Sequence, residues 1–220
     1  MKVTLVSSSE PSKELVAQGI VNAQELVAYC ARVSNPANQT NTDTSEKLIR
    51  YLIKHKHWSP LEMVSACLEI ETTRDIARQI LRHRSFSFQE FSQRYAVADL
   101  GFEYKEARLQ DTKNRQNSIV TEDASLQEEW TILQRNVAST SQVAYQWALD
   151  NGIAKEQARA VLPEGITTSR LYMQGTLRSW LHYIELRSGP ETQKEHREIA
   201  QACASALETV FPMVTEFLVK

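Results

Sequence analysis

The stretch MVSACLEIETTRDIARQILRH, residues 63–83, indicates the fold class of this chain. Apolar residues occupy every second position from Val64 to Ile70, which is the period of a strand with one buried face. From residue 73 onward the apolar spacing becomes that of an amphipathic helix. A strand that leads directly into a helix predicts a domain in which a sheet packs against helices.

The chain on both sides of this stretch predicts more strands and helices. Before it, we expect a strand over Val3–Val6, a helix over 23–33 capped by Asn22, and a helix over 44–57 opened by a capping box of Asp43 and Glu46. After it, we expect a polar surface excursion over 99–123 and helices over Ser125–Leu149, Thr176–Leu186 and Thr192 to about Leu218, the last bent near Pro212. The whole pattern predicts one domain over residues 1–220 with an α+β fold, in which an antiparallel-rich sheet packs with several helices.

The composition is that of an ordinary globular protein. Of the 220 residues 42% are apolar, and the formal net charge is −2, so affinity for nucleic acid would need a local basic patch. The apolar run within residues 1–13 is short for a signal peptide and no run approaches about 18 apolar residues, so we expect a cytoplasmic protein. Cys30, Cys67 and Cys203 are far apart, which predicts buried or half-buried thiols, and no His or Cys spacing predicts a metal site.

The segment RHRSFSFQEFSQRY, residues 82–95, places four potential cations among serines and aromatic rings. Burial of such cations without partners is costly, so the segment is unsuited to a purely structural role. The helix that begins at residue 73 is expected to run to residue 83, which places Gln79, Arg82 and His83 on one face. A basic helix end that offsets the macrodipole is the simpler interpretation, but it explains neither Arg94 nor the alternation of Ser and Phe. We therefore expect an anionic ligand here.

If the anion carries phosphate groups, side chains rather than a glycine-rich loop must bind them. The chain has six glycines and no glycine-rich phosphate loop, so cationic side chains would have to hold any phosphate. Arginine suits that task because its planar guanidinium makes bidentate contacts with phosphate oxygens. Ser92 fits a phosphate ligand better than a nucleophile, because the chain lacks a GxSxG elbow and implies no base near this serine.

The polar positions of this segment resemble the signature of a known family. Arg82-His83-Arg84, followed after seven residues by Ser92 and then by Arg94, is similar to the signature of flavin-dependent thymidylate synthases. Further blocks agree in order, namely HWSPLE (57–62), ARAVLP (158–163), MQGTLRSWLHYIELR (173–187) and QKEHR (193–197). The chain departs from the usual family pattern at Met63, Thr176 and Glu191.

The resemblance implies the reductive methylation of deoxyuridine monophosphate (dUMP) to thymidylate. Methylenetetrahydrofolate would supply the carbon, FAD would carry the redox equivalents, and NADPH or NADH would be the electron source. The resemblance also implies dUMP and folate as partners, with no nucleic acid and no membrane, and a homotetramer whose sites lie between subunits. The family needs no protein thiol as nucleophile, which agrees with cysteines that lie outside every motif.

Carried over by position, the family motifs name two overlapping sets of site residues. The set implied for FAD is Ser59, Arg82, His83, Arg84, Glu90, Thr176, Arg178 and His182. The set implied for the nucleotide is Gln79, Arg82, Glu90, Ser92, Arg94, Arg159 and Arg187. Arg187 is the catalytic candidate, because it would polarise the uracil ring.

Other interpretations of these residues stay open at this point. A single-stranded nucleic-acid-binding module would use the arginines of 82–95 for phosphates and would expose Phe86, Phe88, Phe91 and Tyr95 for base stacking, whereas an enzyme would pack these rings inward. The Thr176 departure permits a pseudoenzyme that binds without turnover. Arg187 could be a helix-end cation facing Glu185 or Glu191, and Arg178 with His182 could be a solvated helix face. Trp58 and Trp180 are expected to pack rather than to stack on flavin.

Overall fold

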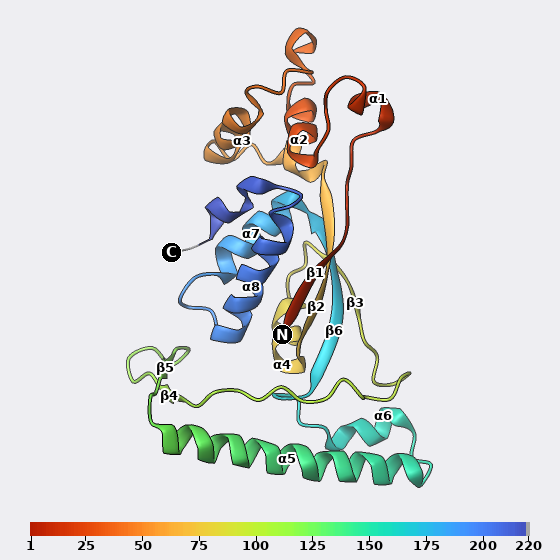
Figure 1. The fold of residues 1–220 in the computed structure, drawn as a ribbon, viewed down its shortest axis with the longest axis vertical. Helices are drawn as coiled ribbons and strands as arrows, with labels where there is room; N and C mark the ends of the chain where they lie inside the picture. Colours follow the sequence, from red (N-terminus) through yellow and green to blue (C-terminus); the bar gives the residue numbers. More distant parts are fainter. Residues whose placement is uncertain (219–220) are drawn as a thin grey trace.

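A four-stranded antiparallel sheet forms the centre of the protein, which a computed structural model describes over residues 1–218 (Figure 1). Its strands, in the order β1-β2-β6-β3, are Lys2–Ser8, Ser65–Thr73, Thr168–Thr176 and Ser87–Glu90. The two central strands pair without a break from Ser65 opposite Thr176 to Thr73 opposite Thr168. This arrangement confirms the antiparallel-rich α+β prediction and the predicted strands β1 and β2.

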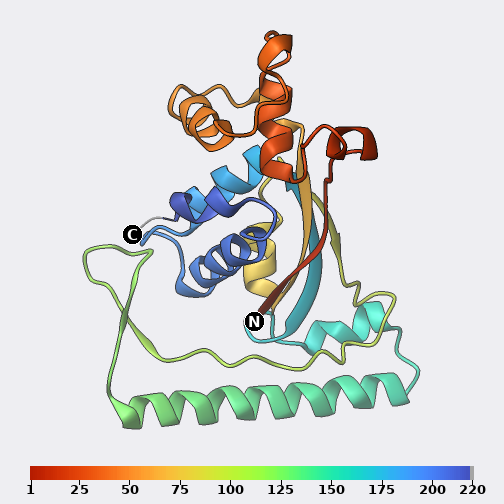
Figure 2. The same cartoon turned by 45° about the horizontal axis from the view of Figure 1, so that its top comes forward.

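Helices cover one face of this sheet. They are α4 (Arg74–Ile80), α7 (Leu177–Arg187) and α8 (Lys194–Leu207), and both views place them on the same side of the strands (Figures 1 and 2). The apolar residues at every second position of β2 face these helices. Leu68 of β2 and Leu171 of β6 are fully buried beneath them. Each such side chain stabilises the fold by about 1.5–3 kcal/mol. Trp180 is fully buried too, and its Nε1 donates to the Ala66 carbonyl at 3.1 Å, so it packs in the core as predicted.

The N-terminal helices lie beyond one end of the sheet (Figure 1). They are α1 (Lys13–Val16), α2 (Ala23–Ala31) and α3 (Ser45–Lys54), with 3-10 turns η1 (Pro36–Asn38) and η2 (Ser59–Glu62). Asn22 caps α2 as predicted, since its side chain accepts from the Glu25 amide at 2.8 Å. The predicted capping box of Asp43 and Glu46 is wrong: Thr44 is the N-cap of α3 and makes no side-chain cap bond. Its hydroxyl instead accepts from the buried Arg32 guanidinium at 2.9 Å.

Four predicted helices end earlier than their patterns suggested, and two of them, α2 and α3, stop at Ala31 rather than 33 and at Lys54 rather than 57. α4 stops at Ile80 rather than 83, so Arg82 and His83 follow it in a turn and do not share a helical face with Gln79. α8 stops at Leu207 and the chain resumes as the 3-10 helix η4 (Pro212–Phe217), so the last helix breaks instead of bending. The residue before a proline avoids the helical region, and Phe211 accordingly has an extended backbone with φ −139° and ψ 86°.

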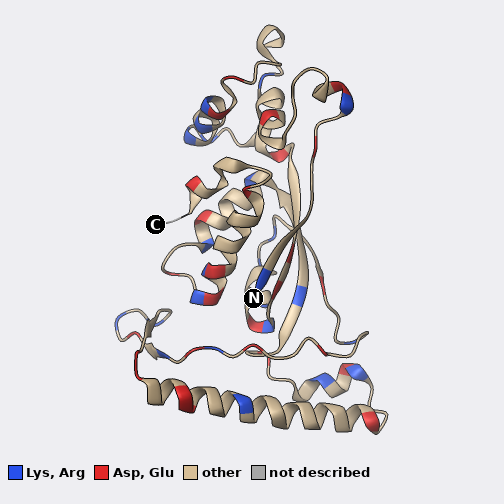
Figure 3. Ribbon diagram, in the orientation of Figure 1, with Lys and Arg blue, Asp and Glu red and all other residues tan. Residues whose placement is uncertain are grey.

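The remaining elements lie across the opposite end of the sheet. The polar excursion forms a hairpin of β4 (Arg108–Gln110) and β5 (Ser118–Val120), and α5 (Ala124–Asp150), α6 (Lys155–Ala158) and η3 (Arg159–Val161) follow it. Charged residues are sparse along α5, and an extended segment of chain runs between this helix and the sheet (Figure 3). The apolar spacing that predicted α5 marks an exposed face, because Trp130 is 42% and Val137 50% exposed. Among residues 1–218 no helix is both long and apolar enough to cross a membrane.

Candidate active site

The Arg82-His83-Arg84 motif occupies the turn between α4 and β3. Arg82 and Arg84 are exposed, and neither guanidinium has a hydrogen-bond or ion-pair partner within the described part of the chain. His83 is half-buried and its ring meets the Tyr183 ring edge-on at 4.9 Å between centroids. Two unpaired guanidinium groups beside a fixed imidazole form a site that favours anions.

Arg187, at the C-terminal end of α7, is held by this motif. Its Nε donates to Nε2 of His83 at 3.0 Å, across 104 residues of sequence. Neither Glu185 nor Glu191 makes the ion pair that a helix-end cation would have. The His83 nitrogen must be unprotonated to accept this bond, and burial, followed by the charges of Arg187 and His182, lowers the His83 pKa to about 4. A neutral imidazole therefore orients a half-buried guanidinium.

The predicted FAD ligands Thr176, Arg178 and His182 lie on the N-terminal half of α7, with Thr176 as its N-cap. A cavity of about 490 Å³ opens there, lined by Trp58, Glu62, Ser85, Arg178, Ser179, His182 and Glu185. Glu62 organises it, since it accepts from Thr176 Oγ1 at 2.8 Å and from Arg178 Nη1 at 2.7 Å. The bond from Thr176, then that from Arg178, outweighs burial and lowers the Glu62 pKa.

Thr176 also explains how this chain accommodates its departure from the family pattern. Its hydroxyl accepts from the Ser179 amide at 3.4 Å, so it caps α7 while it donates to Glu62. Glu62 was not among the site residues predicted from the sequence. Its place at the end of the HWSPLE block could have indicated it. The predicted ligand Ser59 is exposed at the start of η2, one residue from the cavity wall at Trp58.

Four other predicted site residues lie at or beyond the end of β3. Glu90 accepts from Ser169 Oγ at 2.9 Å, and Ser92 is exposed. Arg94 forms a 3.5 Å ion pair with Glu156 of α6, and Arg159 Nε donates to the carbonyl of the same Glu156 at 3.2 Å. A second cavity, of about 320 Å³, includes Arg159 and Glu156 in its wall. The fold thus brings Arg94 and Arg159 together, but no contact within residues 1–218 joins them to Gln79 or Arg187.

The aromatic residues of 82–95 do not share one exposed face. Phe86 is buried, with its ring 4.8 Å from that of Trp180, and Phe88 packs partly against the core. A Cβ at Gly175 would meet the Phe86 ring at 2.4 Å, so only glycine lets this ring approach β6. The expectation that all four rings pack inward is correct for Phe86 but wrong for Tyr95, which is 87% exposed because it follows the sheet.

None of the three cysteines lines the two cavities described above. Cys30 and Cys67 are half-buried and Cys203 is fully buried, as predicted. Burial raises the pKa of the Cys203 thiol, which makes it a poor nucleophile. No cluster of His, Cys, Asp or Glu side chains suited to a metal ion occurs among the described residues.

Comparison with known proteins decides the family. The family model described as thymidylate synthase complementing protein matches residues 14–213. A flavin-dependent thymidylate synthase from Synechocystis sp. is 49% identical over 219 residues, which cover 99% of each chain. This chain belongs to the flavin-dependent thymidylate synthase family. A protein described as a probable member from Paramecium bursaria Chlorella virus 1 is 47% identical over 218 residues, again covering 99% of each chain.

Solved structures show the same fold around a nucleotide analogue. A UMP/dUMP methylase from Streptomyces cacaoi bound with 5-Br dUMP has a TM-score of 0.82 and 27% identity, covering 98% of this chain and 93% of its own. The same methylase bound with 5-Br UMP has a TM-score of 0.81 and 26% identity, covering 98% of this chain and 92% of its own. The family model and the two relatives confirm the resemblance predicted from the Arg82 to Arg94 signature.

Proposed function

We propose that this protein methylates dUMP reductively to thymidylate, using FAD, methylenetetrahydrofolate and NADPH or NADH. The observation that carries the proposal is the Arg187–His83 contact, because it holds a guanidinium ready for a substrate through a neutral imidazole. The names of relatives that match the whole chain support the same activity. The methylase bound with 5-Br dUMP supports a pyrimidine nucleotide as substrate.

The residues present suit a flavin dinucleotide. Arg82 and Arg84 carry unpaired charges that can meet a pyrophosphate, and Arg178 and His182 add donors beside the cavity wall formed by Trp58. Ser59, His83, Glu90 and Thr176 complete the set we assign to FAD. Bound FAD would supply the redox chemistry and the folate would supply the carbon.

The nucleotide would contact two parts of the fold. Ser92, Arg94 and Arg159 offer a hydroxyl and two guanidinium groups for its phosphate. Arg187 and Gln79 would meet the uracil ring, while Arg82 and Glu90 lie in both sets of predicted contacts. Because the Nε of Arg187 is occupied by His83, its two terminal amino groups remain to face the substrate.

Arg187 would act mainly on the transition state. As the uracil ring becomes nucleophilic it gains negative charge, and a guanidinium whose position is already fixed stabilises that charge without reorganising. One such donor contributes about 3–4 kcal/mol in comparable sites. No cysteine is needed for this role, in line with a buried Cys203 thiol whose pKa is raised by burial.

A site between subunits would reconcile the two parts of the predicted nucleotide site. Within one chain, Arg187 is bonded to His83 in the turn after α4, whereas Arg94 and Arg159 both bond to Glu156 of α6. In a homotetramer, the residues that bind the phosphate in one copy can face the residues that bind the uracil ring in another copy. The exposed apolar residues of α5, among them Trp130 and Leu133, offer a surface for such association.

The decisive test combines colour with turnover. We expect the purified protein to be yellow and to form thymidylate from dUMP, methylenetetrahydrofolate and NADPH or NADH. The variant with both Arg82→Ala and Arg84→Ala should fold but be colourless. UMP should be offered beside dUMP, because the Streptomyces methylase is named for both. A colourless wild type that instead binds single-stranded nucleic acid through 82–95 would contradict the proposal.

A further inference from the structure

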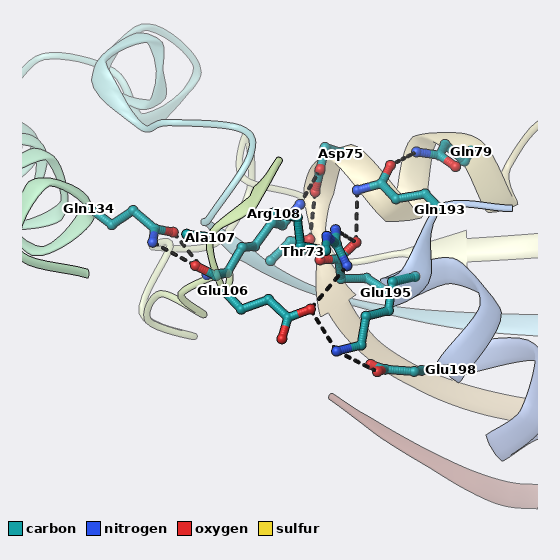
Figure 4. A network of polar contacts seen from close by, with 12 residues as sticks. Thr73, Asp75, Gln79, Glu106, Ala107, Arg108, Gln134, Gln193, Glu195 and Glu198 are labelled. Atoms are coloured by element: carbon teal, nitrogen blue, oxygen red, sulfur yellow. Dashed lines mark hydrogen bonds and ion pairs between the residues drawn. The ribbon is translucent and has the colours of Figure 1, made fainter. Parts of the chain in front are cut away.

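Residues 103–108, here called the strap, form the extended segment that separates α5 from the rest of the molecule. On one side, the backbone N–H and C=O of Lys105 bond to the Gln134 side chain of α5, both at 2.8 Å. On the other side, Lys105 Nζ bonds to Asp75 of α4, and Glu106 accepts from Lys194 Nζ of α8 at 2.6 Å. The strap is therefore tied to both α5 and the helices that cover the sheet (Figure 4).

Arg108, at the end of the strap, makes its strongest contact with α8. Its Nη2 donates to both carboxylate oxygens of Glu195, at 2.7 and 2.9 Å. The two side chains are only 10% and 15% exposed. Burial alone would raise the Glu195 pKa, but the bonds from Arg108 and other donors outweigh it, so the pKa lies below its ordinary value. A surface excursion thus places a permanent cation on an ionised, mostly buried carboxylate.

A run of side-chain hydrogen bonds leads from this pair to Gln79. Gln193 Nε2 donates to Glu195 at 2.9 Å, and its Oε1 accepts from Gln79 Nε2 at 2.8 Å (Figure 4). Gln79 Oε1 lies 3.2 Å from His196 Nδ1, which must carry the proton because an amide oxygen only accepts. His196 Nε2 is then left to accept from Tyr183 Oη at 3.1 Å. Every hydrogen bond in the run is therefore donated in the direction that leads from Tyr183 toward Glu195.

The surroundings of the run support this single direction. His196 is fully buried, and burial first, then the charges of Arg187 and His83, lowers its pKa to about 3, so its ring is neutral. Tyr183 is also fully buried, which raises its pKa, so its hydroxyl keeps the proton that it can donate to His196. If the Gln79 amide turned over, its oxygen would face Gln193 Oε1, which is an acceptor because Gln193 Nε2 is bonded to the Glu195 carboxylate. The run allows only one orientation of this amide.

We propose that Arg108 is a positioning residue for the nucleotide, acting through Glu195 and Gln193 to fix the amide of Gln79. The inference rests on the proposed function, in which Gln79 meets the uracil ring. It assigns the excursion over 99–123 a task, because its strap delivers the charge at which the run begins. A fixed amide binds its ligand without first losing orientational freedom, which increases affinity.

The experiment compares nucleotide affinity in variants of the intact, flavin-loaded protein. dUMP is titrated against the flavin absorption spectrum for wild type, Arg108→Gln, Gln79→Ala and the double variant. Arg115→Gln is the matched control, because Arg115 lies on the same excursion with an exposed side chain. Arg108→Lys keeps the charge on a side chain of different length and donor geometry, and it replaces Arg108→Gln in the cycle should that variant fail to fold.

We expect Arg108→Gln to weaken dUMP binding about tenfold, Arg108→Lys to weaken it less, and Arg115→Gln to leave it unchanged, with flavin content equal in all. The double variant should bind dUMP within about twofold of Gln79→Ala alone, since Arg108 acts through Gln79. A double variant whose loss equals the product of the two single losses would overturn the inference, as would Gln79→Ala with wild-type affinity. In both cases a wild type that binds dUMP leaves the proposed function standing. A wild type that binds no dUMP would overturn both.

Discussion

Arg187 and Arg94 are both predicted to meet the nucleotide, yet the fold holds them in opposite ways. Arg187 is half-buried, and its guanidinium is oriented by a hydrogen bond to the neutral ring of His83. Arg94 is 68% exposed and makes one 3.5 Å ion pair with Glu156, itself 50% exposed. The comparison separates a guanidinium that is fixed before any ligand arrives from one that the ligand must order. Four predictions test this difference, from the largest expected effect to the smallest.

Replacement of Arg187 should be the most damaging change. We expect Arg187→Ala and Arg187→Lys to fold and stay yellow but to lose about 10²–10³ in turnover, because the donor acts mainly in the transition state. Lysine should not rescue it, since a point charge lacks the planar fork. The measurement is thymidylate formation at saturating substrates, with Arg115→Ala as control. Turnover of Arg187→Lys above about a tenth of wild type would mean a loss below about 1.4 kcal/mol and a merely structural cation.

Replacement of Arg94 should affect nucleotide affinity more than turnover. Loss of a charged donor to a phosphate costs about 1.5–3 kcal/mol, so Arg94→Ala should raise the Kd for dUMP about 10–150-fold. Its exposed pair with Glu156 contributes less than about 1 kcal/mol, so the free energy of unfolding should hardly change. Glu156→Gln is the control and should bind dUMP at least as tightly as wild type. A fall in turnover as large as that of Arg187→Ala would remove the contrast between the two arginines.

His83, which orients Arg187, should also affect how the stability of the protein depends on pH. The unfolded chain protonates His83 below its ordinary pKa of 6.5, whereas the folded protein protonates it only near 4. The unfolded state therefore binds more protons in this window, and stability falls as the pH drops from about 6.5 toward 4, by at most about 1.4 kcal/mol per pH unit for this group.

We expect His83→Asn to flatten this slope in urea unfolding at pH 7.5 and 5, whereas replacement of the exposed His55 by Asn should not. The slope that remains in His83→Asn would reflect His196, whose pKa is lowered to about 3. Equal slopes for wild type and His83→Asn would show that His83 is not held neutral, which would weaken the account of Arg187.

Ser92→Ala should have the smallest effect. An exposed hydroxyl that donates to a phosphate contributes about 0.5–1.5 kcal/mol, or up to about 3 kcal/mol because the acceptor is charged, so nucleotide affinity should fall while turnover at saturating dUMP persists. The same titration and assay measure both quantities. Complete loss of turnover with FAD and fold intact would indicate that Ser92 is a nucleophile rather than a ligand of the phosphate.

The structure also adds contacts that no local pattern contains. Glu62 and Thr176 meet across 114 residues, and Arg108 meets Glu195 across 87. Such contacts depend on which elements pack together, so they were absent from the predicted site even where the residue lay inside a recognised motif. No strand was predicted over Thr168–Thr176, although β6 pairs with both β2 and β3.

The sequence by itself determined the features whose energies are local or periodic. The burial period of β2 and the Asn22 cap of α2 follow from neighbouring residues, and the spaced signature from Arg82 to Arg94 determined the family. Only the tertiary structure decided that α4 ends at Ile80 and that Arg187 bonds to His83. Helix ends and ionic partners depend on competing long-range contacts whose free energies are comparable to a single local preference.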